Sequence, residues 1–71
     1  MRYRRMAAVA SDAADAQAAL TALAARYPLA EPDRADVIVA LGGDGFMLET
    51  QHRFLHQGKP IYGMSRGTVA S

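Results

Sequence analysis

Short apolar runs along this chain are separated by longer stretches in which apolar and polar residues mix. Residues 6–10 (MAAVA) and 37–41 (VIVAL) are continuous apolar runs, and residues 61–64 (IYGM) form a third. Runs of this length are typical of strands buried on both faces of a parallel sheet. The pattern therefore predicts three strands.

The stretch between the first two strands has a helical period. Ser11 or Asp12 is suited to cap the start, Arg26 lies near the end where a helix dipole favours a cation, and Pro28 ends the pattern. The spacing predicts a helix over residues 13–27, with one apolar stripe made of Ala16, Ala19, Leu20, Leu23, Ala24 and Tyr27.

A second helix is predicted after residues 42–45, where apolar side chains return at helical spacing. These are Met47, Leu48, Phe54 and Leu55, and Gly58 is placed to end the helix. The element order is then β-α-β-α-β. This order predicts an α/β fold with a parallel sheet and right-handed crossovers, forming part of a doubly wound, Rossmann-like domain.

Composition limits the class of protein. The chain has 71 residues, no cysteine and a formal net charge of +1. A chain of this length forms at most one small domain, and the balanced charge argues against a nucleic-acid or membrane partner. The basic start is followed by too short an apolar run for a secretion signal, and the absence of cysteine fits a cytoplasmic protein.

The segment GGDG, residues 42–45, carries the candidate chemistry. It lies between a predicted strand and a predicted helix, at the sheet edge where α/β proteins bind ligands. Gly42 and Gly43 would let the backbone turn sharply and let an anionic ligand approach, and the helix start favours phosphate. Asp44 would accept a proton from a hydroxyl that is being phosphorylated. The alternative is a tight turn in which the aspartate only caps the helix. The segment matches neither a dinucleotide G-x-G-x-x-G fingerprint nor a Walker A loop.

The surrounding residues resemble the bacterial NAD kinase family. The resemblance rests on VIVALGGDGFMLETQHRF, residues 37–54, followed by GKPIYGMSRGTV, residues 58–69. It implies transfer of a phosphoryl group from ATP or polyphosphate to the adenosine-ribose 2′-hydroxyl of NAD, with a divalent metal such as Mg²⁺. Asp44 would be the proton acceptor, Gly45 would contact the dinucleotide, and Gly42 and Gly43 would shape the phosphate-facing loop.

The chain departs from the family pattern at several positions. Phe46 stands where many members have a small polar residue, and Ser65 stands where an asparagine is expected. Ala70 and Ser71 occupy the place of a Gly-Phe pair. The later Asn-Glu/Asp motif and a β-rich second domain are missing. We therefore expect residues 1–71 to form the amino-terminal part of the kinase α/β domain, incomplete and inactive alone.

Two other functions stay open at this point. One is a different GGDG kinase, acting on a lipid or a sugar phosphate. The other is a non-catalytic fragment that binds nucleotide weakly or associates with a partner subunit. Exposed sheet surface in a partial domain also predicts association, in the full-length kinase as a homo-oligomer.

Three further groups of residues are interpreted as solvated surface. His52 and His56 have the spacing of a metal-binding pair, but Arg53 replaces the glutamate of a metalloprotease motif and no third ligand is evident. Arg66 is interpreted as a surface cation of the loop after the third strand. The cluster at the start is treated as a solvated terminus; it consists of Arg2, Arg4 and Arg5.

Overall fold

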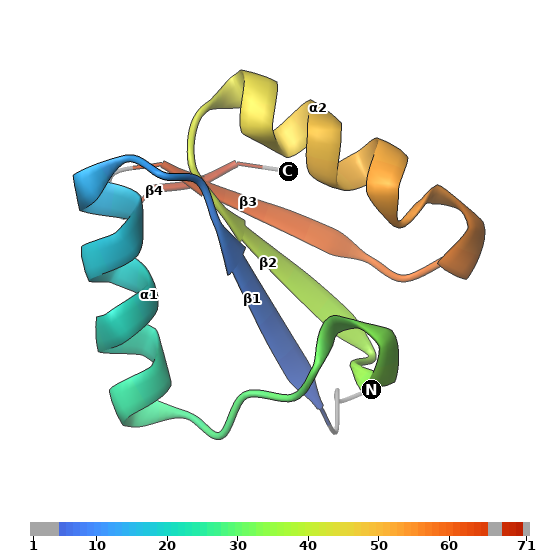
Figure 1. Cartoon of the computed structure of the whole chain (residues 1–71). Coiled ribbons are helices and arrows are strands. Elements are labelled where there is room, and N and C mark those ends of the chain that lie inside the picture. Colours follow the sequence, from blue (N-terminus) through green and yellow to red (C-terminus); the bar gives the residue numbers. More distant parts are fainter. Residues whose placement is uncertain (1–4, 66–67, 71) are drawn as a thin grey trace.

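The computed structural model describes residues 5–65 and 68–70 (Figure 1). It contains four strands, two α-helices and two short 3₁₀ helices. In chain order these are β1 (Met6–Ala10), α1 (Ala14–Arg26), η1 (Pro32–Arg34), β2 (Val37–Leu41), α2 (Asp44–Arg53), η2 (Leu55–Gln57), β3 (Ile61–Ser65) and β4 (Thr68–Ala70). The three predicted strands and both predicted helices are confirmed, with ends within a few residues of those expected.

The sheet has the strand order β1-β2-β3-β4. The first three strands are parallel, and Ala7, Ile38 and Ile61 are neighbours across them. The predicted α/β fold with a parallel β-α-β-α-β core is therefore confirmed. Strand β4 was not predicted; it pairs antiparallel with β3 and has only three residues, too few for a clear apolar pattern.

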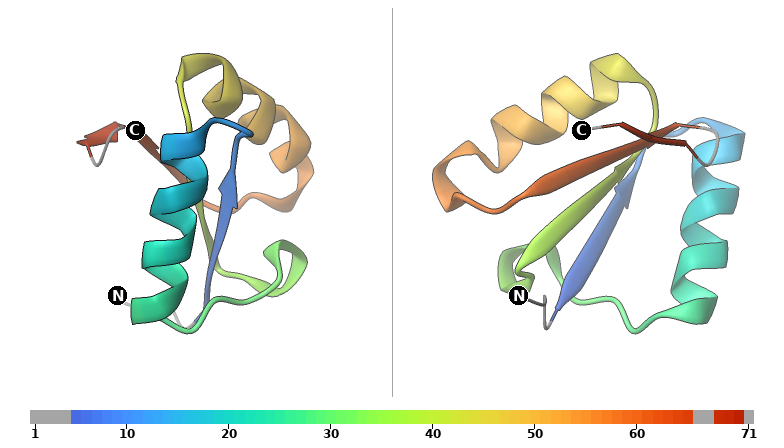
Figure 2. Two further views of the ribbon diagram at one scale, coloured as in Figure 1. Left: turned by 60° about the vertical axis from the view of Figure 1, so that its left-hand side comes forward. Right: turned by 180° about the vertical axis from the view of Figure 1, so that it is seen from behind.

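The two helices lie on opposite faces of the sheet (Figure 2). Helix α1 packs on the face that carries Val39 and Leu41 of β2. Phe54, at the end of α2, packs on the face that carries Ile38. All five residues of β2 are buried, so this strand has apolar side chains to cover on both faces, and each helix covers one of them.

This arrangement corrects one prediction. The strands follow one another in chain order across the sheet, yet the connecting helices lie on opposite faces. The two crossovers therefore have opposite hands, and only one of them can be right-handed. The expectation that both are right-handed is wrong.

The apolar stripe of α1 is only partly buried. Ala16 is buried and Leu20 and Leu23 are half-buried, as the helical period predicts. Tyr27 differs: the helix ends at Arg26, and the Tyr27 side chain is 48% exposed. Within the described part of the chain, neither α-helix has both the length and the apolar character needed to cross a membrane.

The two 3₁₀ helices are linked at the end of the sheet where the strands begin. Lys59 Nζ donates a hydrogen bond to the Pro32 carbonyl at 2.5 Å, and Gln57 Nε2 donates to Asp33 Oδ1 at 3.2 Å. Between them Gly58 has φ of 65°, a left-handed conformation that suits glycine. Gly58 caps η2, whereas α2, the helix it was expected to end, already stops at Arg53. These bonds fix the start of β3 and leave the opposite sheet edge open.

Candidate functional site

The GGDG segment lies at the edge of the sheet where the parallel strands end. The backbone N–H of Gly42 donates to the Met64 carbonyl of β3 at 3.0 Å, and the N–H of Ser11 donates to the Leu41 carbonyl at 2.9 Å. The residues that follow β1 and β2 are therefore held beside the ends of the neighbouring strands. This is the predicted edge for ligand binding in α/β proteins.

Asp44 is the first residue of α2 and is exposed to solvent. Gly43 is the capping residue before it, with no side-chain capping bond, and its carbonyl accepts from the N–H of Met47 at 3.0 Å. The alternative in which the aspartate only caps the helix therefore does not describe this structure. The Asp44 carboxylate makes no hydrogen bond or ion pair with any other described residue. With respect to residues 5–65 and 68–70, it is an unpaired acceptor at the start of a helix.

The backbone conformation of the loop around Asp44 does not require glycine. Gly43 has φ of −86°, and neither Gly42 nor Gly45 has a positive φ, so other residues can adopt these backbone conformations. The change of direction between β2 and α2 therefore does not depend on glycine at these positions. A methyl group on Gly43 or Gly45 would meet no atom within 4 Å. The space in front of these two glycines is therefore open to a ligand.

Gly42 differs from the other two glycines because Phe46 fills the space beside it. A methyl group on Gly42 would lie 2.9 Å from Phe46 Cδ2, 3.0 Å from its Cβ and 3.1 Å from its Cγ. From the sequence, Phe46 was expected to be only a variation in the family pattern, and this contact was not predicted. The available signal was the spacing of four between an aromatic residue at a helix start and a glycine before it.

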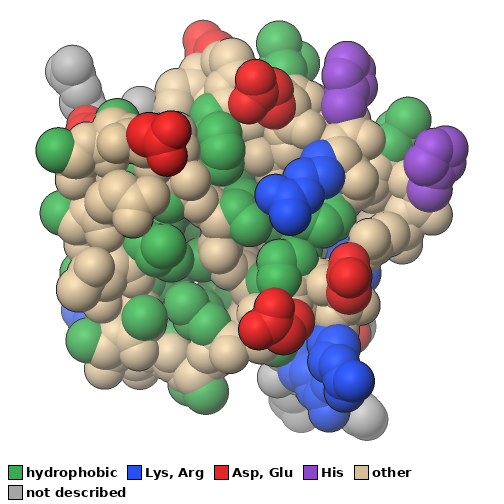
Figure 3. Space-filling view, viewed as in Figure 1, with side chains coloured by type: hydrophobic (Ala, Val, Ile, Leu, Met, Phe, Trp, Pro, Cys, Tyr) green, Lys and Arg blue, Asp and Glu red, His purple; other side chains and the backbone are tan. Residues whose placement is uncertain are grey.

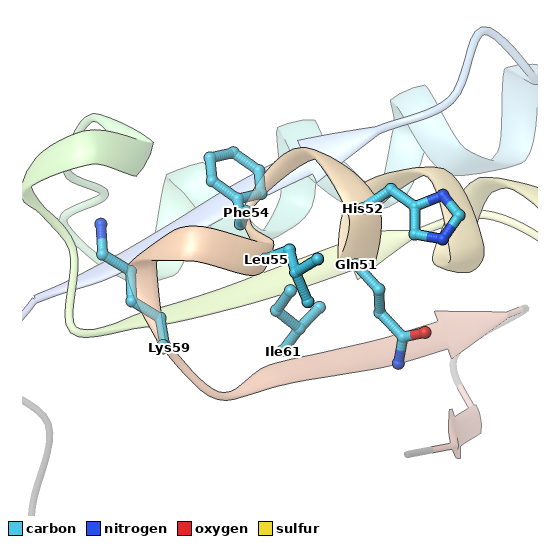
Figure 4. A pocket seen from close by; sticks show the side chains of 7 residues that line it. Gln51, His52, Phe54, Leu55, Lys59 and Ile61 are labelled. Carbon is cyan, nitrogen blue, oxygen red and sulfur yellow. The ribbon is translucent and has the colours of Figure 1, made fainter.

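The hollow shown in Figure 4 does not include the GGDG residues. That hollow measures about 370 Å³ and is lined by Phe54, Leu55, Lys59 and Ile61, among others, at the start of β3. A second hollow of about 250 Å³ lies beside Arg5 and Leu29, near the start of β1. Both are at the end of the sheet opposite to GGDG.

The described residues do not form a metal site. No group of three or more histidine, cysteine, aspartate or glutamate side chains is suitably placed in residues 5–65 and 68–70. His52 lies in α2 and His56 in η2, so they do not share one continuous α-helix. Acidic and basic side chains are interspersed over the face shown in Figure 3.

Several predicted residues lie at the margins of what the structure describes. Ser65 is the last residue of β3, and Ala70 is the last residue of β4. Arg66 and Ser71 lie outside the described residues, as do the first two arginines of the chain. The structure therefore locates all four GGDG residues but not the whole loop after the third strand.

The fold and the site describe an α/β protein with a glycine-rich loop and an exposed carboxylate where the parallel strands end. Curated NAD kinases are similar to nearly all of this chain. The chain is 54% identical over 68 residues to the NAD kinase of Rhizobium meliloti, which covers 96% of this chain and 26% of that protein. It is 55% identical over 65 residues to the NAD kinase of Caulobacter vibrioides, covering 92% of this chain and 25% of that protein. The NAD kinase of Xylella fastidiosa is 54% identical over 65 residues, again 92% of this chain and 25% of that protein.

The match over nearly the whole of this chain is consistent with a fragment of a bacterial NAD kinase. It spans about a quarter of the length of the curated relatives it matches. No family model matches the chain, and no solved structure matches it either. The resemblance noted in the sequence is therefore confirmed by relatives that match nearly all of this chain.

Proposed function

We propose that this chain supplies the aspartate-bearing loop of an NAD kinase. In the proposed reaction, the adenosine-ribose 2′-hydroxyl of NAD receives a phosphoryl group from ATP or polyphosphate, and NADP is formed. The observation that carries the proposal is the Asp44 carboxylate, exposed and unpaired among described residues, with open space in front of the glycine on each side of it. The relatives' shared name, NAD kinase, supports this substrate over the lipid or sugar phosphate of other GGDG kinases.

Each residue of the loop has a distinct proposed role. The 2′-oxygen of NAD attacks the terminal phosphorus of the donor, the bond from that phosphorus to the bridging oxygen breaks, and ADP leaves when ATP is the donor. Asp44 accepts the proton that the hydroxyl loses. Gly43 and Gly45 let the dinucleotide approach the backbone, and Gly42 shapes the loop that faces the phosphates.

We assign this chain no part in holding a metal ion. A divalent metal such as Mg²⁺ commonly accompanies ATP, but the described residues offer no group of side chains that fits one. The roles proposed for residues 42–45 depend only on the backbone, the open space and one carboxylate.

The chain alone is proposed to bind nucleotide weakly and to lack activity. Because it spans about a quarter of its relatives, we propose that the remaining contacts to NAD and ATP come from the other three quarters of a complete kinase. We further propose that the kinase is cytoplasmic and is a homo-oligomer. No role in binding nucleic acid or membranes is proposed.

A chimeric kinase tests the function directly. The chain replaces the matching quarter of a curated relative, and NADP formation from NAD and ATP is measured. We expect activity, and we expect Asp44→Asn to lower kcat by about 10²- to 10⁴-fold because the proton acceptor is lost.

The matched control is Asp15→Asn, since Asp15 is also exposed in the first turn of a helix. It should leave kcat unchanged. A chimera in which Asp44→Asn is as active as the native loop would refute the role of Asp44. A native chimera that binds NAD but forms no NADP would favour a non-catalytic fragment.

A further inference from the structure

Gly42 and Phe46, which flank the segment around Asp44, make contacts with other residues, whereas Gly43 and Gly45 have open space beside them. On one side, the Gly42 N–H is bonded to the Met64 carbonyl at 3.0 Å. On the other side, the Phe46 carbonyl accepts a hydrogen bond from Thr50 Oγ1 at 2.8 Å, and Thr50 is only 3% exposed. The loop is therefore tied to β3 before Asp44, and after Asp44 the chain is already in the first turn of α2, where the Thr50 bond is a local bond within the helix.

The contact between Gly42 and Phe46 joins the two sides of the loop. The side chain of Phe46 lies only 2.9–3.1 Å from the position where any other residue at 42 would place its Cβ. Two of the three closest atoms are the Cβ and Cγ of Phe46, which are near the backbone and cannot swing away as the end of a long side chain could. A larger residue at 42 would therefore have to displace the start of α2, which carries Asp44.

We propose that Phe46 is a positioning residue for Asp44, and that residue 42 is glycine to receive the Phe46 side chain and not to admit a ligand. The contact joins Gly42 to Phe46, the two ends of the segment 42–46. It thereby fixes where Asp44, the first residue of α2, lies relative to the ends of the strands. This inference deepens the proposed function and rests on it, because the position of Asp44 matters only if its carboxylate acts on a ligand. It assigns different reasons to neighbouring glycines: packing at Gly42 and ligand access at Gly43 and Gly45.

The first test measures the coupling between the two residues in the 71-residue chain, by thermal melts of four proteins. These are the native chain, Gly42→Ala, Phe46→Ala and the double variant. Gly42→Ala should lower Tm more when Phe46 is present than in the Phe46→Ala background, because alanine at 46 removes the ring contacts at 2.9 and 3.1 Å. An equal loss of Tm in both backgrounds would overturn the contact as the reason for Gly42.

The second test measures catalysis in the chimeric kinase. Phe46→Ala should lower kcat by roughly 10- to 100-fold through misplacement of Asp44 while KM for NAD stays within about twofold. Phe46→Leu is the matched variant, since leucine retains a Cβ, a Cγ and a Cδ2 to pack on Gly42. It should restore most of the native kcat.

The outcomes separate the two proposals. An unchanged kcat in Phe46→Ala, or a rise in KM alone, overturns the positioning role. The positioning role is also overturned if Phe46→Leu loses as much kcat as Phe46→Ala although the Tm of Phe46→Leu is the same as that of the native chain. An inactive native chimera, or full activity in Asp44→Asn, instead overturns the proposed function and the positioning role with it, whereas the coupling of Tm values in the 71-residue chain is measured independently of activity.

Discussion

Replacing Gly45 by alanine should stabilise the chain and weaken its binding of NAD at the same time. Gly45 is the second residue of α2, its φ is not positive, and a methyl group there would meet no atom within 4 Å. The native fold therefore loses nothing from the substitution. A dinucleotide that approaches this backbone would meet the added methyl group.

The size of the stabilisation follows from the unfolded chain. Alanine at a compatible glycine position raises the free energy of unfolding by about 0.4–1 kcal/mol, because the unfolded state loses conformational entropy. In a domain of this length, each 1 kcal/mol moves Tm by about 4–8 °C, so the expected rise is about 2–8 °C. The same substitution at Gly58 should have the opposite sign, with a loss of about 1–2 kcal/mol, because Gly58 is in the left-handed region at φ of 65°.

Thermal melts of the 71-residue chain and KM for NAD in the chimeric kinase measure the two effects. We expect Gly45→Ala to raise both Tm and KM, whereas Gly58→Ala lowers Tm and leaves KM unchanged. A Gly45→Ala chimera with native KM would refute the reasoning that ligand access explains this glycine. A lowered Tm would contradict the open space observed beside Gly45.

Three further predictions concern stability and metal binding. Ile38→Ala removes a fully buried side chain and should cost about 2–5 kcal/mol, a large share of the roughly 4–10 kcal/mol expected for 71 residues, as measured by urea unfolding. Lys59→Met removes the hydrogen bond to the Pro32 carbonyl and should lower the free energy of unfolding by about 1 kcal/mol; an unchanged urea midpoint would show that this bond contributes nothing. Addition of Zn²⁺ should not raise Tm, since His52 and His56 lie on different helical segments and no third ligand accompanies them in the described residues; a rise that is lost in His52→Ala would contradict this.

The strands and helices could be predicted because their signals are local. Residues 37–41 are an unbroken apolar run, and all five are buried in β2 as that pattern indicates. The second helix was also predicted, since glycines separate the apolar run from a helical period, and α2 begins at Asp44, within the segment after which it was expected. Parallel pairing followed from the order of the elements and not from any single residue.

The arrangement of these elements depended on contacts between distant residues and could not be predicted in the same way. Side chains alternate along β2, so Ile38 and Val39 face different helices, but the sequence does not state which helix takes which face. The difference between Gly42 and the other glycines of the loop could not be predicted for a related reason. It depends on Phe46, which fills the space beside Gly42 only in the folded chain.

The burial of β2 on both faces has a consequence for how the loop moves. This strand also has a hydrogen-bonded neighbour on each side, so its amides should exchange with solvent only when the whole domain unfolds. Gly43 and Asp44, which are exposed residues, follow shortly after this strand, and their amides should exchange through small local openings. Protection from hydrogen exchange is therefore expected to fall steeply within a few residues of Leu41. The loop that opens locally then directly follows the strand whose amides exchange most slowly.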